Sequence, residues 1–201
     1  MKNDHLVYWL VYDGYLKDYF INVRNVEIDP IFNQTLLSYG RGKLFNIWPE
    51  NVRAYIIGER PVNFLMCTGH IKAVSDNVKN IIEKIAKGAA EFLPIQFYYE
   101  DGRPYTKMTY WVCNTLAIVD ALDWDKTVWT ETTPPNREDP DALLMVIKPR
   151  MYANKVANNH FFRILISNWV SPKVYVSREL KRAFEFEKCT VGIEFTPIIT
   201  T

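Results

Sequence analysis

Two aspartates near the middle of the chain are the first side chains whose spacing could do chemistry. Asp120 and Asp123 lie three residues apart in the string "IVDALDWD". One helical turn would place both carboxylates on the same face. A pair of this kind can transfer a proton or hold a cation. The simpler interpretation, which we favour, is that they cap a short helix after a strand.

The histidines do not form a recognisable metal or catalytic set. His5, His70 and His160 are the only three in the chain, and none has a second histidine at metal-ligand spacing. The string "SYGRGKL" from Ser38 carries two glycines and a lysine, but it lacks the spacing of a phosphate-binding loop. The sequence therefore predicts no cofactor and no bound metal.

The cysteines are no better suited to chemistry. Cys67, Cys113 and Cys189 are an odd number at wide spacing, and the first two stand inside apolar strings. A nucleophilic thiol needs an exposed position beside a polarising group, and a disulfide framework needs paired cysteines. We therefore expect three buried free thiols.

The amino-acid composition limits the classes of protein to which the chain can belong. The 201 residues are 48% hydrophobic and 23% charged, which is typical of one globular domain spanning residues 1–201. The net charge of +1 gives no field to attract a polyanion, so we expect no nucleic-acid partner. No stretch approaches the roughly 20 apolar residues of a membrane span, and the start lacks a signal-peptide cleavage site. We expect a soluble cytoplasmic protein, monomeric or homodimeric, without a membrane partner.

A repeated string organises the chain. Glu-Phe-x-Pro-Ile occurs at residues 91–95 and again at 194–198, and each copy follows a valine-serine pair that ends in Ser75 or Ser177. Each copy predicts a strand, a serine cap, a helix and a second strand. The second helix is expected to be shorter. The residues predicted to form the apolar helix stripes are Val78, Ile81, Ile82 and Ile85 in the first copy, and Leu180, Ala183 and Phe184 in the second.

The exit strands of the two copies should share one orientation. Phe92 and Phe195 are expected to pack inward, with Glu91 and Glu194 on the opposite face. Because proline cannot donate to a central ladder, each exit strand should begin, or lie at a sheet edge, near its proline.

Further strands complete an α+β fold with mainly antiparallel strands and at least two helices. Hairpins are predicted at Asp101-Gly102, with a type I′ turn, and at Asp13-Gly14; "VRAYII" and "ALLMVIKPRMY" are predicted to form further strands. The predicted segments are N-terminal strands over 1–45, a first helix-strand unit with its hairpin over 46–123, a loop over 124–142 and a second helix-strand unit over 143–201.

The loop is the candidate binding surface. Prolines interleaved with threonine, asparagine and aspartate argue against regular structure from residue 123 to 141, and long loops in compact domains are often functional. Tryptophan and arginine are enriched at interface hot spots. The alternative is a solvated loop that packs its own tryptophans. The candidate contact residues are Trp124, Trp129, Glu131, Arg137, Glu138 and Asp139.

The order of these strings resembles a family of bacterial immunity proteins from polymorphic toxin systems, the group first catalogued as an uncharacterised domain in a myxobacterial protein. The family's asparagine-bearing strand and Val-Asp-x-Leu-Asp-type segment match residues 114–123. Its phenylalanine-arginine pair matches Phe162-Arg163, and its S-x-x-L-K helix matches residues 177–181. The resemblance covers roughly residues 45–198.

The resemblance implies binding to a cognate toxin made by the same cell or its kin, and no catalysis. The toxin would be a cytoplasm-acting effector such as a nuclease. An enzyme that reverses the toxin's modification, with Asp120 and Asp123 around a cation, is the alternative. A ligand-binding or scaffold domain is a third possibility.

Overall fold

Strands and helices form an α+β architecture, as the sequence predicts. The computed structural model describes residues 6–12, 42–45, 48, 52–56, 61–67, 71–130, 146–167 and 169–201. The elements, in chain order, are β1 Val7–Tyr12, β2 Arg53–Ile56, β3 Phe64–Met66, β4 Lys72–Ser75, α2 Asp76–Ile85, β5 Ala90–Tyr99, β6 Tyr110–Thr115, β7 Ile118–Val119, β8 Val128–Trp129, β9 Val146–Lys148, β10 Arg150–Met151, α3 Ala153–Val156, β11 Phe161–Ile166, β12 Trp169–Ser177, α4 Arg178–Phe186 and β13 Ile193–Thr200.

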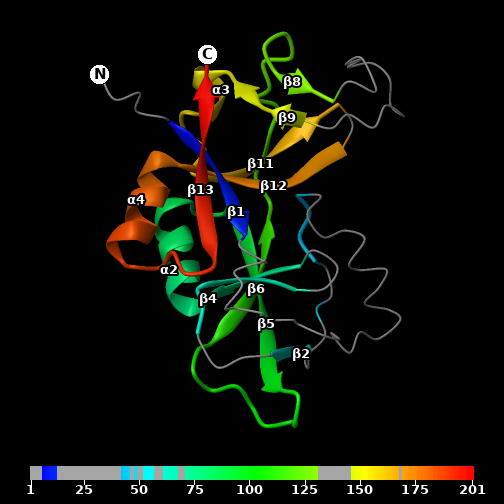
Figure 1. Ribbon diagram of the computed structural model, residues 1–201, viewed down its shortest axis with the longest axis vertical. Helices are drawn as coiled ribbons and strands as arrows, with labels where there is room; N and C mark the ends of the chain where they lie inside the picture. Colours follow the sequence, from blue (N-terminus) through cyan, green and yellow to red (C-terminus); the bar gives the residue numbers. More distant parts are fainter. Residues whose placement is uncertain are drawn as a thin grey trace.

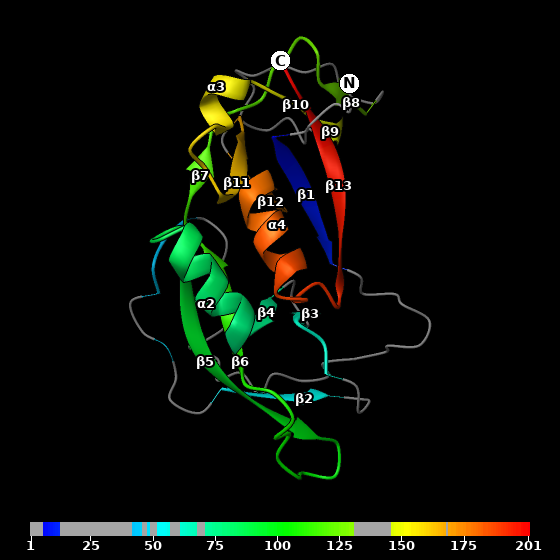
Figure 2. The same ribbon diagram turned by 90° about the vertical axis from the view of Figure 1, so that its left-hand side faces the viewer.

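The strands form two large sheets and a small ribbon. The six-stranded sheet has the order β10-β13-β1-β12-β11-β7, the five-stranded sheet β2-β5-β6-β4-β3, and the ribbon β8-β9. Helices α2 and α4 pack against each other on the same side of the molecule (Figures 1 and 2). Among the described residues, no helix has the length and apolar character needed to cross a lipid bilayer.

The two large sheets share one order of elements. Strands β2-β5-β6-β4-β3 correspond to β10-β13-β1-β12-β11, and in both sets only the first pair is parallel. The segments β4-α2-β5 and β12-α4-β13 therefore occupy equivalent places. The sets differ in the origin of the central strand. Strand β6 follows β5 directly, whereas β1 comes from the other end of the chain.

The strand registers of the two sheets also agree. The matching pairs are Pro94 with Trp111 and Pro197 with Tyr8 on one side of the central strand, and Val74 with Trp111 and Val176 with Tyr8 on the other. Trp111 in β6 thus holds the same position as Tyr8 in β1. This correspondence lets each residue of one unit be compared with its counterpart in the other.

The two prolines sit inside strands that have neighbours on both sides, so neither strand begins at its proline. At the proline itself, however, each strand is paired on one side only, as the predicted edge requires. Strand β2 pairs with β5 only from Gln96 onward, and β10 pairs with β13 from Ile199 onward. Each begins two residues beyond Pro94 or Pro197, so the missing N–H leaves no gap in a ladder.

Serine caps begin both long helices, as the sequence predicts. Ser75 Oγ and Ser177 Oγ each accept a hydrogen bond from the backbone N–H three residues later, at 3.4 Å and 3.1 Å. Each hydroxyl has a second partner from an equivalent place in the fold. Asn63 Nδ2 lies 3.3 Å from Ser75 Oγ, and His160 Nδ1 lies 3.0 Å from Ser177 Oγ. Through these second partners, each cap joins its helix to the start of another strand. Asn63 directly precedes β3, and His160 directly precedes β11.

Both helices bury their apolar stripes in one hydrophobic cluster. Val78 and Ile82 of α2, with Leu180 and Phe184 of α4, are fully buried there, and α4 is the shorter helix. The rings of Phe64 and Phe184 meet edge to face at 5.5 Å, which joins β3 of one sheet to the helix of the other. The cluster thus connects both sheets through the helix layer.

The repeated glutamate-phenylalanine pairs take the predicted orientation. Phe92 and Phe195 pack against the cluster beneath the helices. Glu91 faces the other side of its sheet, where its carboxylate accepts a hydrogen bond from Asn114 Nδ2 at 3.0 Å. Glu194 is exposed. The repeated string therefore serves the construction of the fold.

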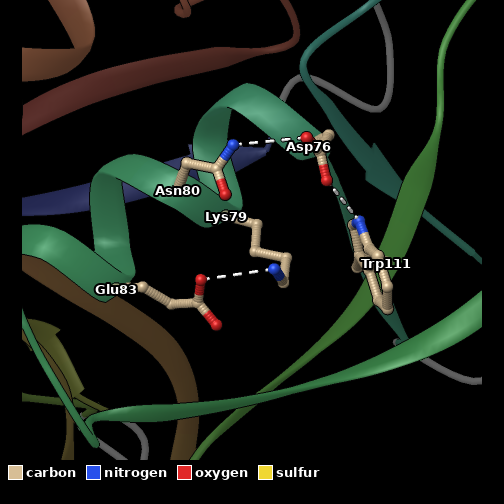
Figure 3. Close-up of polar contacts among 5 residues, drawn as sticks. All are labelled: Asp76, Lys79, Asn80, Glu83 and Trp111. Atoms are coloured by element: carbon tan, nitrogen blue, oxygen red, sulfur yellow. Dashed lines mark hydrogen bonds and ion pairs between the residues drawn. The ribbon is translucent and has the colours of Figure 1, made fainter.

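A lysine fastens the outer side of α2 to strand β6 (Figure 3). Lys79 Nζ lies 4.8 Å from the ring centroid of Trp111 and 3.2 Å from the carboxylate of Glu83. Asp76 accepts hydrogen bonds from Trp111 Nε1 at 2.9 Å and from Asn80 Nδ2 at 3.2 Å. Cation–π contact and hydrogen bonding together fix the helix on its sheet.

The same arrangement recurs on α4. Lys181 Nζ lies 5.0 Å from the ring of Tyr8 and 5.3 Å from the ring of Phe195, and it pairs with Glu185 one turn later. Tyr8 lacks the indole N–H of its counterpart in β6. Arg178 occupies the place that Asp76 holds in α2.

The predicted type I′ turn is wrong. That turn needs positive φ at both central residues. Gly102 has a φ of 83°, but Asp101 is not in the left-handed region. Tyr99 N donates to Arg103 O at 2.8 Å, and Gly102 N donates to Tyr99 O. The connection is a three-residue loop closed by a left-handed glycine.

Other strand predictions need correction because long-range pairing overrides local pattern. The string "ALLMVIKPRMY" contains β9 and β10, which belong to different sheets. Strand β8 lies within the segment predicted to be irregular. Strand β1 pairs with β12 and β13 on its two sides, whereas Asp13 and Gly14 lie outside the described residues.

Two buried cations bond to carbonyl oxygens near the start of β12, and one of them, Lys72 of β4, joins the two sheets. Lys72 Nζ donates to the carbonyl oxygen of Pro172 at 3.0 Å, and Arg163 Nε donates to that of Ser171 at 2.7 Å. Burial, together with the nearby Arg163 guanidinium, lowers the pKa of Lys72 to about 8. The fold thus holds a positive charge where solvation is poor.

We expect Lys72→Met to change how stability depends on pH. Lys72 titrates near pH 8 when folded and near pH 10.4 when unfolded. Between these values the unfolded chain binds more protons, so this lysine makes the wild type more stable as pH rises. The variant lacks that rise. The unfolding free energy of the wild type minus that of the variant should therefore rise by up to about 3 kcal/mol between pH 7.5 and pH 10.5.

Urea unfolding of both proteins across this range measures the effect. Taking the difference between them removes the opposite trend expected from the buried cysteines, which the two proteins share. A constant difference would show that Lys72 titrates normally.

We also expect the two caps to contribute comparably to stability. Ser75→Ala and Ser177→Ala should each lower the free energy of unfolding by about 1 kcal/mol, because each leaves a helix N–H without its acceptor. Urea unfolding checks this, and Ser171→Ala is a control because Ser171 is also buried but begins no helix. Equal losses in all three variants would argue against a specific capping role.

Candidate functional site

The β8–β9 ribbon carries the described part of the predicted binding loop. Val128 pairs with Lys148 and Trp129 with Val146, with an irregular register between them. Thr127 Oγ1 at the base of the ribbon accepts a hydrogen bond from the backbone N of Arg150 at 3.1 Å. This bond joins the ribbon to strand β10 and so to the six-stranded sheet.

The two candidate tryptophans face the body of the protein. Their rings stack with centroids 4.6 Å apart and an interplanar angle of 30°. Trp129 Nε1 donates to the carbonyl oxygen of Trp124 at 3.3 Å. Both side chains pack with Val146 against a hydrophobic cluster of the six-stranded sheet. Both tryptophans therefore contribute to the packing of the six-stranded sheet.

The outer face of the ribbon is apolar and exposed. Val128 has 45% of its surface exposed and Ile147 has 51%. Trp129 and Val146 instead pack against the cluster of the six-stranded sheet. The sequence analysis missed the two exposed residues because β-branched residues are ordinary in strands, so no local pattern marks them.

The other candidate contacts belong to the segment between β8 and β9. Glu131, Arg137, Glu138 and Asp139 lie in residues 131–145, outside the described part of the chain. These residues connect β8 to β9 in sequence. Their proposed role therefore depends on the position of the ribbon that carries them.

Asp123 is held by contacts that stabilise the fold. It is buried, and its carboxylate accepts a hydrogen bond from Thr201 Oγ1 at 2.9 Å and lies 3.2 Å from Lys126 Nζ. Burial acts to raise the pKa of Asp123, but the hydrogen bonds from Thr201 and Lys126 outweigh it and hold the pKa below its usual value. The carboxylate therefore joins the base of the ribbon to the last strand.

Asp120 does not share that environment. Its carboxylate is partly exposed and lies 3.9 Å from Lys155 Nζ. Residues 120–123 are not helical, so the predicted helical turn is absent and the two aspartates have different partners. In the described residues, no group of three or more histidine, cysteine, aspartate or glutamate side chains could hold a metal ion.

The cysteines are buried free thiols, as predicted. Burial raises the pKa of Cys67 to about 12 and that of Cys113 to about 12. Burial and the neighbouring Glu187 also raise the pKa of Cys189. All three favour the protonated form at neutral pH, which is a poor nucleophile.

A small hollow between the sheets is a cationic feature that the sequence analysis missed. It has a volume of about 220 Å³, and Trp9, Lys72 and Lys173 are among its lining residues. Lys173 Nζ lies 4.1 Å from the ring centroid of Trp9, and burial lowers the pKa of Lys173. No local pattern marks either lysine as buried, because the elements that cover them come from distant parts of the sequence.

Comparison with known proteins gives one informative result. The model of an immunity protein family (Imm11) matches residues 20–200. No curated protein matches the chain significantly. The family match covers both helix-strand units and the ribbon, and it begins earlier than the resemblance detected from about residue 45. The chain therefore belongs to the immunity protein family (Imm11).

Proposed function

We propose that the protein binds a cognate bacterial toxin and neutralises it in a stoichiometric complex, without catalysis. The family match over residues 20–200 is the observation that carries this proposal. An immunity protein must recognise its toxin, so the family membership supports a toxin as the partner.

The chemistry of the described residues favours binding over catalysis. Asp120 lies beside Lys155 and Asp123 beside Lys126, contacts that support structural roles for the two carboxylates. The buried thiols have raised pKa values. By contrast, the ribbon presents an apolar outer face, the kind of surface that protein interfaces use.

We propose that the ribbon and its loop form the toxin contact. Val128 and Ile147 would provide apolar area, and stacked Trp124 and Trp129 would hold the ribbon in place beneath them. The connecting loop would add polar contacts. The proposed loop contacts are Glu131, Arg137, Glu138 and Asp139.

The proposed toxin acts in the cytoplasm, for example as a nuclease. The free thiols suit a reducing compartment. Three of the four charged loop residues named above are acidic, which would complement the basic cleft of an enzyme that binds nucleic acid. The complex would hide that cleft from its substrate.

The first test uses the toxin encoded beside this gene. The purified pair should form a complex, and toxin activity should fall in proportion to added immunity protein until the two are equimolar. Protection at a small fraction of one equivalent would instead indicate an enzyme. Asp120→Asn with Asp123→Asn, checked for folding by circular dichroism, should still protect. If the pair neither associates nor protects cells, the proposed function is wrong.

The second test concerns the ribbon. Val128→Glu with Ile147→Glu should weaken toxin affinity by about tenfold or more, because buried apolar contacts would be replaced by desolvated charge. Leu44→Glu is a matched control, since Leu44 is 61% exposed and lies outside the ribbon. Calorimetric titration measures each affinity. Similar losses in both proteins would rule out a specific role for the ribbon.

A further inference from the structure

The hollow between the two sheets has a chemistry that the proposed toxin contact does not use. Lys72, Lys173 and Trp9 line it, and none of its lining residues in the described part of the chain is acidic. Met66 also lines the hollow and is 38% exposed. A ligand can therefore enter the hollow from solvent beside Met66.

The hollow lies where strands β1 and β12 separate. Their pairing ends at Leu10 and Val174, although β1 continues beside β13 as far as Tyr12. In the same register Pro172 would face Tyr12, and proline has no N–H to donate to a ladder. Pro172 and Val174 both line the hollow. The proline of β12 therefore accounts for the separation of the two strands.

The matching registers of the two sheets provide an internal comparison. Lys173 holds the place of Ile71 in the other unit, and Lys72 holds the place of Val174. Ile71 is buried in the core of the five-stranded sheet, and Val174 is buried beneath the helices. Each lysine thus stands where the other unit has a buried aliphatic side chain. The shared framework therefore does not require a cation at either position.

The hollow is electrically positive. Burial lowers the pKa of both lysines, so each ammonium group is less well solvated than in water. Lys173 Nζ lies 3.4 Å from the carbonyl oxygen of Val146 and 4.1 Å from the ring centroid of Trp9. A carbonyl oxygen and an aromatic ring carry only partial negative charge, so they offset the ammonium charge in part. The Arg163 guanidinium adds a further positive charge near Lys72. An anion in the hollow would therefore be attracted by these cations.

The size of the hollow limits the anion to a few heavy atoms. Its volume of about 220 Å³ is several times the roughly 30 Å³ that one water molecule occupies. It is also below the roughly 300–1,000 Å³ of pockets that hold drug-sized ligands. The remaining lining is mainly apolar, which suits the hydrocarbon part of a small organic acid.

We propose that the hollow binds a single carboxylate group, with Lys173 and Lys72 as its cationic partners and Trp9 and Met66 beside its hydrocarbon part. A free small acid and an acidic side chain of a protein partner share this chemistry. Carboxylate binding does not require the proposed toxin contact, so either can fail without the other.

Titration of the full chain with sodium acetate at pH 7 tests the site, with sodium chloride at equal ionic strength as the reference. The readout is the NMR signal of the Trp9 indole N–H, identified by its absence from Trp9→Phe. The signal should shift and saturate with a Kd of roughly 1–10 mM, because a ligand of so few atoms makes few contacts. A shift that grows linearly with acetate, without saturation, overturns the proposal.

Variants of the lysine over Trp9 identify the cation. Lys173→Met should weaken acetate binding by about tenfold or more, because it removes a charged hydrogen-bond donor, whereas Lys173→Arg should retain binding. Lys79→Met is the matched control, since Lys79 lies 4.8 Å from the ring of Trp111 but does not line the hollow. It should bind acetate like the wild type. Circular dichroism verifies that each variant is folded, and equal weakening in Lys173→Met and Lys79→Met contradicts the proposal.

A second titration distinguishes the two sources of the carboxylate. The probe is a capped peptide with one glutamate between glycines, and the same peptide with glutamine is its control. Saturable binding of acetate and of the glutamate peptide, without binding of the glutamine peptide, assigns the hollow to an acidic side chain of a protein partner. Binding of acetate alone assigns it to a free small acid. If neither acetate nor the glutamate peptide saturates, the hollow is not a carboxylate site.

Discussion

The central position of β1 is the constraint on which the six-stranded sheet depends. This strand lies between β12 and β13, so residues 7–12 complete a sheet whose other strands lie between residues 118 and 200. Leu10 of β1 joins the cluster beneath the helices, and Val7 joins the cluster on the sheet's other side. Strand β1 therefore supports α4 on one face and the elements that carry the ribbon on the other.

The two halves of the fold share one framework but present different surfaces. Equivalent residues hold each helix on its sheet, from the serine caps to Lys79 and Lys181 on their aromatic partners. The surfaces beyond that framework diverge. The ribbon follows the first unit, and an exposed aromatic residue marks the second helix. A shared scaffold with different surfaces suits a protein whose role is recognition.

Local signals were predictable from the sequence, and distant pairings were not. The caps at Ser75 and Ser177 and the apolar stripes depend on residues within one or two turns, and these predictions are confirmed. The partners of β1 lie more than 160 residues away, so its local pattern could not identify them. The same limit hid the burial of Lys72. At the candidate site, sequence composition drew attention to the tryptophans, but only the folded structure shows that Val128 and Ile147 are exposed.

The placement of β1 also has a consequence for folding during synthesis. Strands β2 to β6 are contiguous in sequence, so the five-stranded sheet can form while the ribosome is still translating. Strand β1 leaves the ribosome first, yet its neighbours β12 and β13 leave last. Closing so long a loop is entropically costly and slow. The nascent chain therefore carries β1 without its partners until β12 and β13 have emerged, a period in which this apolar strand is open to chaperone binding.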